Sequence, residues 1–217
     1  MSALTDVFLA YGQRSKVPAD QVVIRRGSAI SRLYYIISGR VILYTTSPGG
    51  REIAFDIIRP GEVFALTGLS SRNSAIFEAK TITDCEVVTL ERETARRVVL
   101  ADPVVALEAF EALIEVLRTR TNLAESLATR DLGARLAHWI LSQFRRSGRQ
   151  LVPGASVSVE VSQRLIAGFS GVSRETVNRK LKEWSSGGII SLTGRTLTLL
   201  APDELVRIAG EIDELRR

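Results

Sequence analysis

Three charged residues in the last third of the chain have the chemistry needed to read the edges of DNA bases: Arg174, Glu175 and Arg179. An arginine fork can donate hydrogen bonds to both O6 and N7 of guanine, and a glutamate can accept one from N4 of cytosine. A carboxylate directed at anionic DNA is otherwise unfavourable. Its place between two arginines therefore favours base reading over general attraction to a polyanion.

The residues around this set form the pattern of two short helices joined by a tight turn. Ala167 supplies the small residue needed where two helices cross closely, and Gly171, four residues later, suits a left-handed turn. Three apolar residues follow at positions that close the core between the helices: Val172, Val177 and Leu181. Four polar residues are predicted to project to solvent on the opposite side: Arg174, Glu175, Asn178 and Arg179. This arrangement is typical of a recognition helix in the major groove; the alternative is a helix-turn-helix module that binds protein.

Further polar residues of this region are candidates for contacts to the DNA backbone or for secondary contacts. They are Ser162, Gln163, Ser173, Thr176, Asn178 and Lys180. Residues 187–200 have the pattern of a β-hairpin turned at Thr193 and Gly194. This hairpin would be a wing, with Arg195 available to a phosphate.

The N-terminal half contains many short β-type runs separated by turn signals. The runs are residues 22–24, 33–37, 41–44, 53–58, 63–66, 76–79 and 87–90. Many short strands at near-regular spacing favour an antiparallel sandwich or a rolled barrel. Three glycines between the runs, Gly27, Gly39 and Gly50, are interpreted as turn residues with positive φ.

After Asp102 and Pro103 the pattern changes to that of one long amphipathic helix. Apolar residues recur at spacings of three, four and seven: Phe110, Leu113, Ile114, Leu117, Ala124 and Leu127. A helix of about seven turns is longer than a small barrel can cover, so part of the stripe is predicted to meet a second copy of the chain. The alternative is a helix packed wholly on its own domain. One predicted interface row is Phe110, Leu117 and Ala124, and its companion row is Leu113, Arg120 and Leu127.

Asp131 is interpreted as the N-cap of a further helix, which places the hinge between domains at residues 128–131. The predicted organisation is a β-rich domain over residues 1–100, a dimerisation helix over 101–130 and a DNA-binding domain over 131–217. The chain has 29 Lys and Arg against 24 Asp and Glu, and its first 128 residues contain fifteen of each sign. The whole positive excess therefore lies in the C-terminal part, which favours a polyanionic partner, although scattered surface arginines would give the same count.

The composition argues against several classes of protein. The N-terminus has no basic segment followed by an apolar run, so no signal peptide is expected. No stretch approaches the roughly 20 apolar residues of a membrane span, so no membrane partner is expected. A single cysteine, Cys85, excludes an internal disulfide framework and is typical of the reducing cytoplasm.

With the segment Ser173-Arg-Glu-Thr-Val-Asn-Arg179 in view, the chain resembles the family of the cyclic-AMP receptor protein and the fumarate-nitrate reductase regulator (CRP/FNR). In that family Ser-Arg-Glu-Thr-Val-x-Arg opens the recognition helix. Residues 33–41 resemble the family's β-roll, and residues 60–64 resemble the entry to its phosphate-binding cassette, so the likeness covers nearly the whole chain.

The resemblance implies an α+β fold: a cyclic-nucleotide-binding-like β-roll, a long dimerisation helix and a winged helix-turn-helix. It further implies a homodimer that binds an inverted repeat in double-stranded DNA, with half-sites like TGTGA, and that recruits or blocks RNA polymerase. The family residues that contact guanine and cytosine correspond to Arg174, Glu175 and Arg179.

The candidate effector pocket departs from the family's pattern. Its residues are Gly61, Glu62, Ala65, Leu66, Thr67, Arg72, Asn73, Ser74, Arg120 and Thr121. Where nucleotide-binding members have Gly-Glu-Leu, whose glutamate holds the ribose, this chain has residues 65–67 without a carboxylate. Their phosphate-binding Arg-Ser corresponds to Asn73-Ser74, although Arg72 could substitute if the loop is reshaped, and their adenine-contacting hydroxyl pair corresponds to Arg120-Thr121. Each lost charge-assisted partner costs about 1.5–3 kcal/mol, so cyclic AMP is not expected to be the effector.

No cofactor or metal is predicted. An iron–sulfur cluster needs about four cysteine ligands, and the chain has only Cys85, which is interpreted as a buried inert thiol rather than a redox switch. Haem is not expected, because the only histidine, His138, lies beyond the predicted hinge. A cupin-type enzyme would need metal-binding histidines that residues 1–128 lack, so no enzymatic activity is expected. The second alternative to a transcription regulator is a cyclic-nucleotide-binding module whose helix-turn-helix does not bind DNA. For the regulator itself two possibilities stay open: its effector is an organic ligand, or it has no effector.

Overall fold

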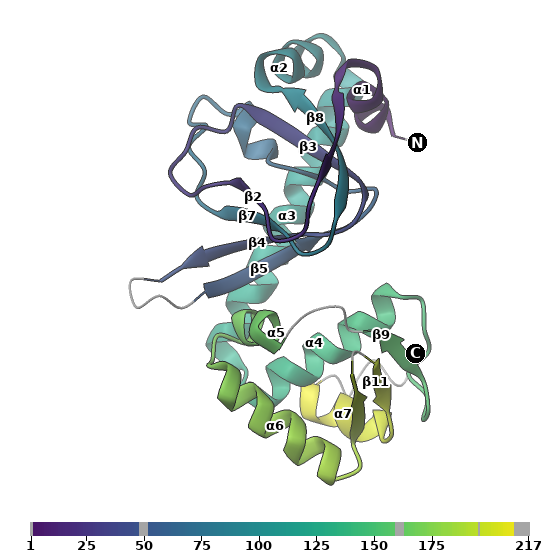
Figure 1. Cartoon of the computed structure of the whole chain (residues 1–217). Helices are drawn as coiled ribbons and strands as arrows, with labels where there is room; N and C mark the ends of the chain where they lie inside the picture. The colour runs from purple at the N-terminus through teal and green to yellow at the C-terminus, as the bar shows by residue number, and fades with distance from the viewer. Residues whose placement is uncertain (1, 48–51, 159–162, 195, 211–217) are drawn as a thin grey trace. The chain divides into compact units, whose positions relative to one another are not determined.

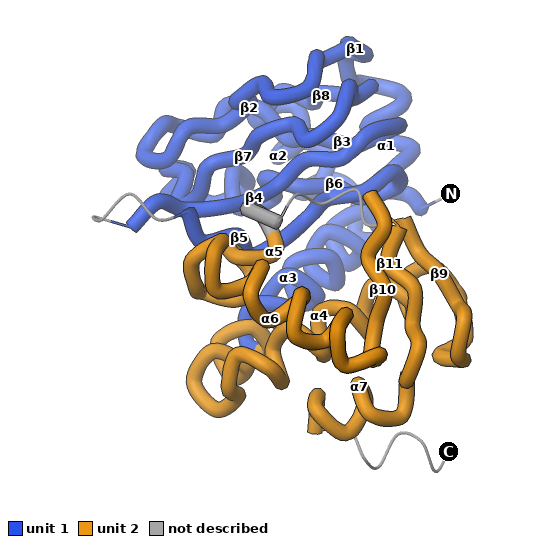
Figure 2. Tube along the Cα trace, turned by 60° about the horizontal axis from the view of Figure 1, so that its bottom comes forward, with its two compact units in different colours: residues 1–121 blue, residues 122–217 orange. Residues whose placement is uncertain are grey.

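The computed structural model describes residues 2–47, 52–158, 163–194 and 196–210, and of residues 159–165 it describes no side chain. The chain folds into two compact units, Met1–Thr121 and Asn122–Arg217, which Figure 2 shows in different colours. The boundary between them falls within the long helix α3 (Pro103–Thr129). Each unit has its own hydrophobic core.

Unit 1 is built on two four-stranded antiparallel sheets (Figure 1). One sheet has the strand order β1 (Gln13–Val17), β8 (Cys85–Glu91), β3 (Arg32–Ser38) and β6 (Val63–Phe64). The other has the order β2 (Val22–Ile24), β7 (Glu78–Thr81), β4 (Val41–Thr46) and β5 (Glu52–Ile58). With the long helix and the helix-turn-helix described below, this confirms the predicted α+β fold.

The core of unit 1 has two parts because successive side chains of a strand point to opposite faces. Val87 and Val88, adjacent on β8, belong to different clusters. The first cluster fills the roll and includes Ile24, Ile36, Val41, Leu43, Phe64, Phe77, Cys85 and Val87. The second joins β3 and β8 to helices α1 (Ala3–Tyr11), α2 (Arg92–Ala101) and α3, and includes Leu4, Phe8, Leu33, Leu66, Val88, Leu90, Ala95, Val105 and Ala109.

The single cysteine lies in the interior of the roll, as the interpretation of an inert thiol requires. Cys85 is 3% exposed, and its Sγ lies 3.3 Å from the carbonyl oxygens of Arg40 and Thr83. Burial raises the pKa of the Cys85 thiol, so the unreactive protonated form is favoured.

The turn at Gly39 needs glycine for both conformation and space. Gly39 has φ of +86°, and a Cβ added there would lie 2.3 Å from the Asp84 carbonyl oxygen.

One carboxylate anchors α1 to α3. Glu108 accepts hydrogen bonds from the backbone N–H groups of Ala3 at 3.0 Å and Leu4 at 2.7 Å. These are donors that the first turn of a helix leaves unpaired, and Ser2 caps a third by accepting from Thr5. The backbone hydrogen bonds hold the pKa of Glu108 below its ordinary value.

Glu108→Gln is therefore expected to lower the unfolding temperature at neutral pH and to have little effect in acid. Because the folded-state pKa of Glu108 is lowered, its stabilisation is fully present above the ordinary glutamate pKa of about 4.3 and is lost as the pH falls through the folded-state value. Thermal unfolding between about pH 3 and pH 7 measures the difference. The matched control is Glu111→Gln, an exposed carboxylate on the same helix. An equal loss at both ends of the pH range would contradict the role of the charge.

Unit 2 contains the predicted helix-turn-helix and a small sheet. Its helices are α4 (Leu132–Arg146), α5 (Gln163–Ser170), α6 (Arg174–Ser186) and α7 (Pro202–Ala209). Its strands are β9 (Ser156–Ser158), β10 (Ile190–Thr193) and β11 (Thr196–Leu199), in the order β10-β11-β9. Asp131 caps α4 as predicted, since its Oδ1 accepts a hydrogen bond from the Ala134 N–H at 2.8 Å. The core includes Leu136, Ile140, Leu141, Phe144, Val177, Trp184, Ile190, Leu197 and Leu205.

The hairpin of β10 and β11 forms as predicted, but its turn lies one residue later than expected. Thr193 pairs with Thr196, so Thr193 is the last paired residue of β10 rather than a central turn residue. Gly194 has φ of +60°, which suits the first central position of a tight hairpin turn. Arg195 itself lies outside the described residues, so its contact with a phosphate remains a prediction.

Candidate functional site

A glycine turn and a serine cap fix the direction of α6. Gly171 has φ of +68°, the left-handed conformation expected for this turn, and the Val172 N–H donates to the Ala167 carbonyl at 3.3 Å. Ser173 is the N-cap of α6, and its Oγ accepts a hydrogen bond from the Thr176 N–H at 3.2 Å. The first turn of α6 is thus held in place by the residues that precede it.

The three predicted base-reading residues are exposed at the start of α6. Arg174, Glu175 and Arg179 face solvent, while the other side of the helix packs into the unit 2 core. Its own backbone N–H, the Ser173 hydroxyl and the charge of Arg174 lower the pKa of Glu175, so this side chain is ionised at neutral pH. A negative charge is also favoured at the N-terminal end of a helix. The surface offers two guanidinium forks and one carboxylate, which match the guanine and cytosine edges.

Of two other polar residues of α6, Asn178 is placed differently from the prediction, and Lys180 has a partner within the helix. Asn178 does not project freely to solvent: it is half-buried, and its Oδ1 is buried with no hydrogen-bond partner among the described groups. Asn178 lies three residues before the buried Leu181, so it stands at the border of the packed face. Lys180 pairs with Glu183 at 2.8 Å and lies 5.8 Å from the centre of the Trp184 ring, so its charge is partly compensated within the helix.

The remaining candidates for DNA backbone contacts lie before or within the cap. Ser173 is exposed, and its Oγ lies 2.9 Å from Thr176 Oγ1, so both hydroxyls take part in the cap. Gln163 is the first residue of α5, but its side chain is not described. Ser162 lies outside the described residues. The DNA contacts of these residues remain predictions.

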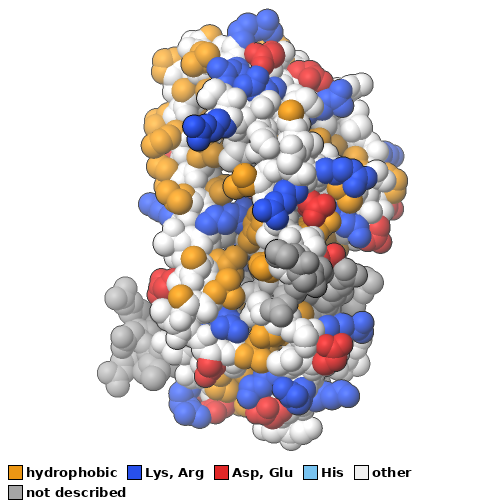
Figure 3. Space-filling model, turned by 90° about the vertical axis from the view of Figure 1, so that its left-hand side faces the viewer, with side chains coloured by type: hydrophobic (Ala, Val, Ile, Leu, Met, Phe, Trp, Pro, Cys, Tyr) orange, Lys and Arg blue, Asp and Glu red, His pale blue; other side chains and the backbone are white. Residues whose placement is uncertain are grey.

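Helix α3 exposes an apolar face. It has 27 residues, close to the predicted seven turns, and Val105 and Ala109 bury its first turns against unit 1. Phe110 is 59% exposed and Leu117 is 65% exposed, and Figure 3 shows hydrophobic side chains gathered along one edge of the molecule. The large apolar residues that the helix exposes are Val104, Leu107, Phe110, Leu117 and Leu127. Such a face is typical of an interaction surface.

The two rows of the predicted dimer interface differ in exposure. In the first row Phe110, Leu117 and Ala124 are all exposed. In the companion row Leu113 is half-buried and packs against the second core cluster of unit 1, and Arg120 contacts β5 of the same unit.

No helix in the described part of the chain is long and apolar enough to cross a membrane.

The segment predicted as the end of a strand at residues 63–66 instead begins a 3-10 helix, η1 (Leu66–Leu69). Strand β6 ends at Phe64 because Ala65 adopts a left-handed conformation with φ of +66°. Leu66 is 4% exposed and belongs to the core cluster formed with α1 and α2, whereas Thr67 is exposed. The position at which the resemblance places a ribose-binding carboxylate is therefore occupied by a core residue.

The loop after η1 uses its polar groups within the fold. The Asn73 carbonyl accepts from the Ile30 N–H at 2.8 Å, and the Ser74 hydroxyl donates to the Gly27 carbonyl at 3.3 Å. Arg72 has an exposed side chain. At the position where the resemblance places a phosphate-binding arginine the chain has Asn73, and the neighbouring cation is the exposed Arg72.

A tight turn leads into β6 and includes two more pocket candidates. Gly61 has φ of +89°, and its N–H donates to the Ile36 carbonyl at 2.9 Å. Glu62 accepts a hydrogen bond from the Arg59 N–H on its Oε2 at 2.9 Å. The Glu62 carboxylate therefore serves the turn itself.

Arg120 and Thr121, the α3 candidates for the pocket, differ in their contacts. The Arg120 guanidinium donates to the Phe55 carbonyl at 2.9 Å, lies 4.0 Å from the centre of the Phe55 ring and is 3.9 Å from Asp56 Oδ2. Burial lowers the pKa of Arg120, and the Asp56 charge opposes that shift. Thr121 is exposed. The contacts of Arg120 with β5 were not foreseen, because no sequence pattern links residues 65 positions apart.

Two family models match the chain, one in each unit. A cyclic nucleotide-binding domain matches residues 14–102, and a Crp-like helix-turn-helix domain matches residues 134–208. Together the two matches cover most of the chain.

Similar proteins of known name or structure cover almost the same length. The CRP-like cAMP-activated global transcriptional regulator of Mycobacterium tuberculosis is 31% identical over 193 residues, which are 88% of this chain and 86% of that protein. The solved structure of FixK2 from Bradyrhizobium japonicum has a TM-score of 0.79 at 24% identity and covers 91% of this chain and 96% of its own. The c-di-GMP responsive global regulator CLP of Xanthomonas campestris has a TM-score of 0.78 at 25% identity, covering 91% and 98%.

Proposed function

Because the chain belongs to the CRP/FNR family of transcription regulators, we propose that it acts as a homodimer on a two-fold symmetric DNA operator. The observation that carries this proposal is the exposed set of Arg174, Glu175 and Arg179 on the capped start of α6. Helix α6 enters the major groove of each half-site, and the wing of β10 and β11 lies along the backbone beside it.

The apolar face of α3 supports the dimeric state. Two copies of one recognition helix read half-sites about one helical turn apart, roughly 34 Å, and the operator is an inverted repeat with half-sites like TGTGA. In this proposal residues 1–100 form the sensor domain, residues 101–130 form the dimerisation helix and residues 131–217 bind DNA. The dimer works in the cytoplasm by recruiting or blocking RNA polymerase and has no enzymatic activity of its own.

Selection from randomised double-stranded DNA tests the readout. The wild-type protein should enrich an inverted repeat, and Arg179→Ala or Arg174→Ala should lose about 1–3 kcal/mol of binding and flatten the preference at one guanine position. Arg195→Ala should instead weaken all sequences alike. The matched control is Lys182→Ala, which removes one exposed positive charge from the same helix. If Arg179→Ala selected the same sequence as the wild type, the assigned readout would be wrong.

We further propose that cyclic AMP is not the effector and that operator binding does not need it. Leu66 is a core residue and offers no acceptor to a ribose hydroxyl, and Asn73 stands where a phosphate-binding arginine belongs. A cyclic phosphate buried without a cation is strongly disfavoured. The named relatives differ in effector, since one is described as cAMP-activated and another as c-di-GMP responsive.

Calorimetry with cyclic AMP and cyclic GMP on ligand-stripped protein tests this second proposal. We expect no binding in the micromolar range and operator affinity that is unchanged by either nucleotide. Arg72 is the residue that could restore a phosphate contact, so Arg72→Gln serves as the control variant. Micromolar binding together with tighter operator binding would identify the protein as a cyclic-nucleotide receptor. Mass spectrometry of molecules released from the purified protein would then identify any other organic effector.

A further inference from the structure

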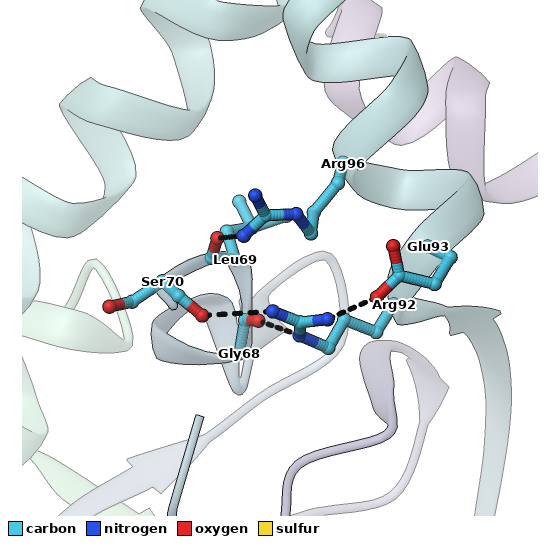
Figure 4. Close-up of polar contacts among 6 residues, drawn as sticks. All are labelled: Gly68, Leu69, Ser70, Arg92, Glu93 and Arg96. Atoms are coloured by element: carbon cyan, nitrogen blue, oxygen red, sulfur yellow. Dashed lines mark hydrogen bonds and ion pairs between the residues drawn. The ribbon is translucent and has the colours of Figure 1, made fainter. Parts of the chain in front are cut away.

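Two arginines of α2 bind the backbone at the end of η1 (Figure 4). Arg92 donates from Nε to the Gly68 carbonyl at 2.7 Å and from Nη2 to the Ser70 carbonyl at 3.1 Å. Arg96 donates from Nη1 to the Leu69 carbonyl. Three consecutive carbonyl groups, those of residues 68–70, therefore each accept a hydrogen bond from an arginine.

These contacts match the electrostatics of a helix end. The last carbonyl groups of a helix have no partner within it and carry partial negative charge, so a cation placed there is favoured. The Arg92 side chain is 18% exposed, and its Nη1 also contacts Glu93, so the guanidinium is held on several sides. A planar guanidinium can donate hydrogen bonds to two carbonyl oxygens at once, and a lysine ammonium in the same place lacks this fork geometry.

The other end of the segment is fixed by packing. Ala65 holds its left-handed conformation, and Leu66 is buried in the core cluster. A Cβ added to Gly68 would lie 2.6 Å from Ile30 Cγ2, so the segment lies directly against Ile30. The Arg92 N–H donates to the Ser31 carbonyl at 2.9 Å, which joins the start of α2 to the same neighbourhood.

We propose that Arg92 and Arg96 are positioning residues that keep residues 66–70 ordered without any small molecule and tie this segment to α2. Helix α2 ends at Ala101 and α3 begins at Pro103, so only Asp102 separates the arginine-bearing helix from the proposed dimerisation helix. Because this connection is so short, we expect loosening of residues 66–70 to weaken operator binding as well, and the ligand-free protein with both arginines to bind its operator. This consequence for DNA rests on the proposed function, whereas the ordering of the segment does not.

Hydrogen exchange on the full-length, ligand-free protein tests the ordering. The Gly68 and Ser70 amides donate to the carbonyls of Ala65 and Thr67, so they report on η1 directly. In the double variant Arg92→Gln/Arg96→Gln their exchange should accelerate at least tenfold, while exchange in α4 and α6 stays unchanged. The control is Arg97→Gln, which alters an exposed arginine of the same helix that has no hydrogen bond or ion pair among the described residues. Unchanged exchange at Gly68 and Ser70 in the double variant would overturn the proposal.

Two further variants keep the test decisive if the double variant unfolds. Arg92→Lys, which retains the charge but not the planar fork, should give an intermediate acceleration, and Gly68→Ala should loosen the same amides by displacing η1 from Ile30. Gly68→Ala shows that exchange at these amides responds when η1 is displaced, and if Arg92→Lys nevertheless exchanges like the wild type, the arginine fork does not position this segment.

Operator titration of the ligand-free variants tests the consequence for DNA. The double variant should bind the selected operator at least fivefold more weakly than the wild type, and Arg97→Gln should bind equally well. Accelerated exchange with unchanged operator affinity would overturn the link to DNA binding. A wild-type protein that selects no operator at all would instead refute the proposed function, and the exchange measurement would still decide whether the arginines order the segment.

Discussion

Leu117→Asp is expected to convert the protein to monomers and to abolish tight operator binding. Leu117 is 65% exposed in the single chain, so the substitution leaves the core of unit 1 intact. In a symmetric dimer it removes two buried leucines, worth about 1.5–3 kcal/mol each, and sets two carboxylates near each other in an apolar interface. The dimer dissociation constant should therefore rise at least about a hundredfold.

Light scattering and operator titration measure the two effects of Leu117→Asp. The matched control is Asn122→Asp, which adds the same charge at an exposed position of α3 outside the apolar row. The monomers should keep the thermal transition of the wild-type roll. An unchanged dimer would show that the apolar face of α3 is not the interface.

Val177→Asp is expected to unfold unit 2 while unit 1 stays folded. Val177 is 0% exposed in the core between α5 and α6, and the substitution loses its burial and places a charge without a partner in an apolar site. The two losses together exceed about 4 kcal/mol, a large part of the stability of a domain of this size. Unit 1 shares none of this core, so its sheets should be unaffected.

The chain carries its own probes for this experiment. Both tryptophans, Trp139 and Trp184, lie in unit 2, so their fluorescence reports on that unit alone, and hydrogen exchange in β3 and β8 reports on unit 1. Val177→Thr adds a hydroxyl without a charge and should lower the stability of unit 2 less. If loss of the tryptophan signal were accompanied by exchange throughout β3 and β8, the two units would fold as one.

The sequence was informative wherever burial imposes a pattern on neighbouring residues. The strands from β2 to β8 alternate in burial or are largely buried, so most of them were recognised, although with shifted ends. Strand β1 was missed because four of its five residues are exposed and its place depends on backbone pairing with β8. Helix α2 was missed because it has only ten residues, its first two turns are mostly polar or charged, and Ala95 is its only fully buried residue.

The candidate DNA surface was more predictable than the candidate effector pocket. A recognition helix depends on local requirements, such as the positive φ of Gly171 and the cap at Ser173, and these are visible in consecutive residues. Arg92 and Arg96 bind backbone carbonyls, which any residue supplies, so no side-chain pattern could reveal their partners. Asn178 was misplaced because it stands at the border of two helix faces, where periodicity alone does not decide.

The burial of Leu66 also limits how unit 1 could acquire nucleotide binding by mutation. The Leu66 side chain is 4% exposed and lies in an apolar core cluster. A glutamate at this position would therefore lie among apolar side chains and would not reach a ribose hydroxyl. An unpaired carboxylate there would destabilise the fold by several kcal/mol before any ligand could compensate. A mutational path toward nucleotide binding must therefore first turn residues 65–67 toward the roll and refill the space left in the core. Leu66→Glu on its own is therefore expected to lower the stability of unit 1 without creating a nucleotide site.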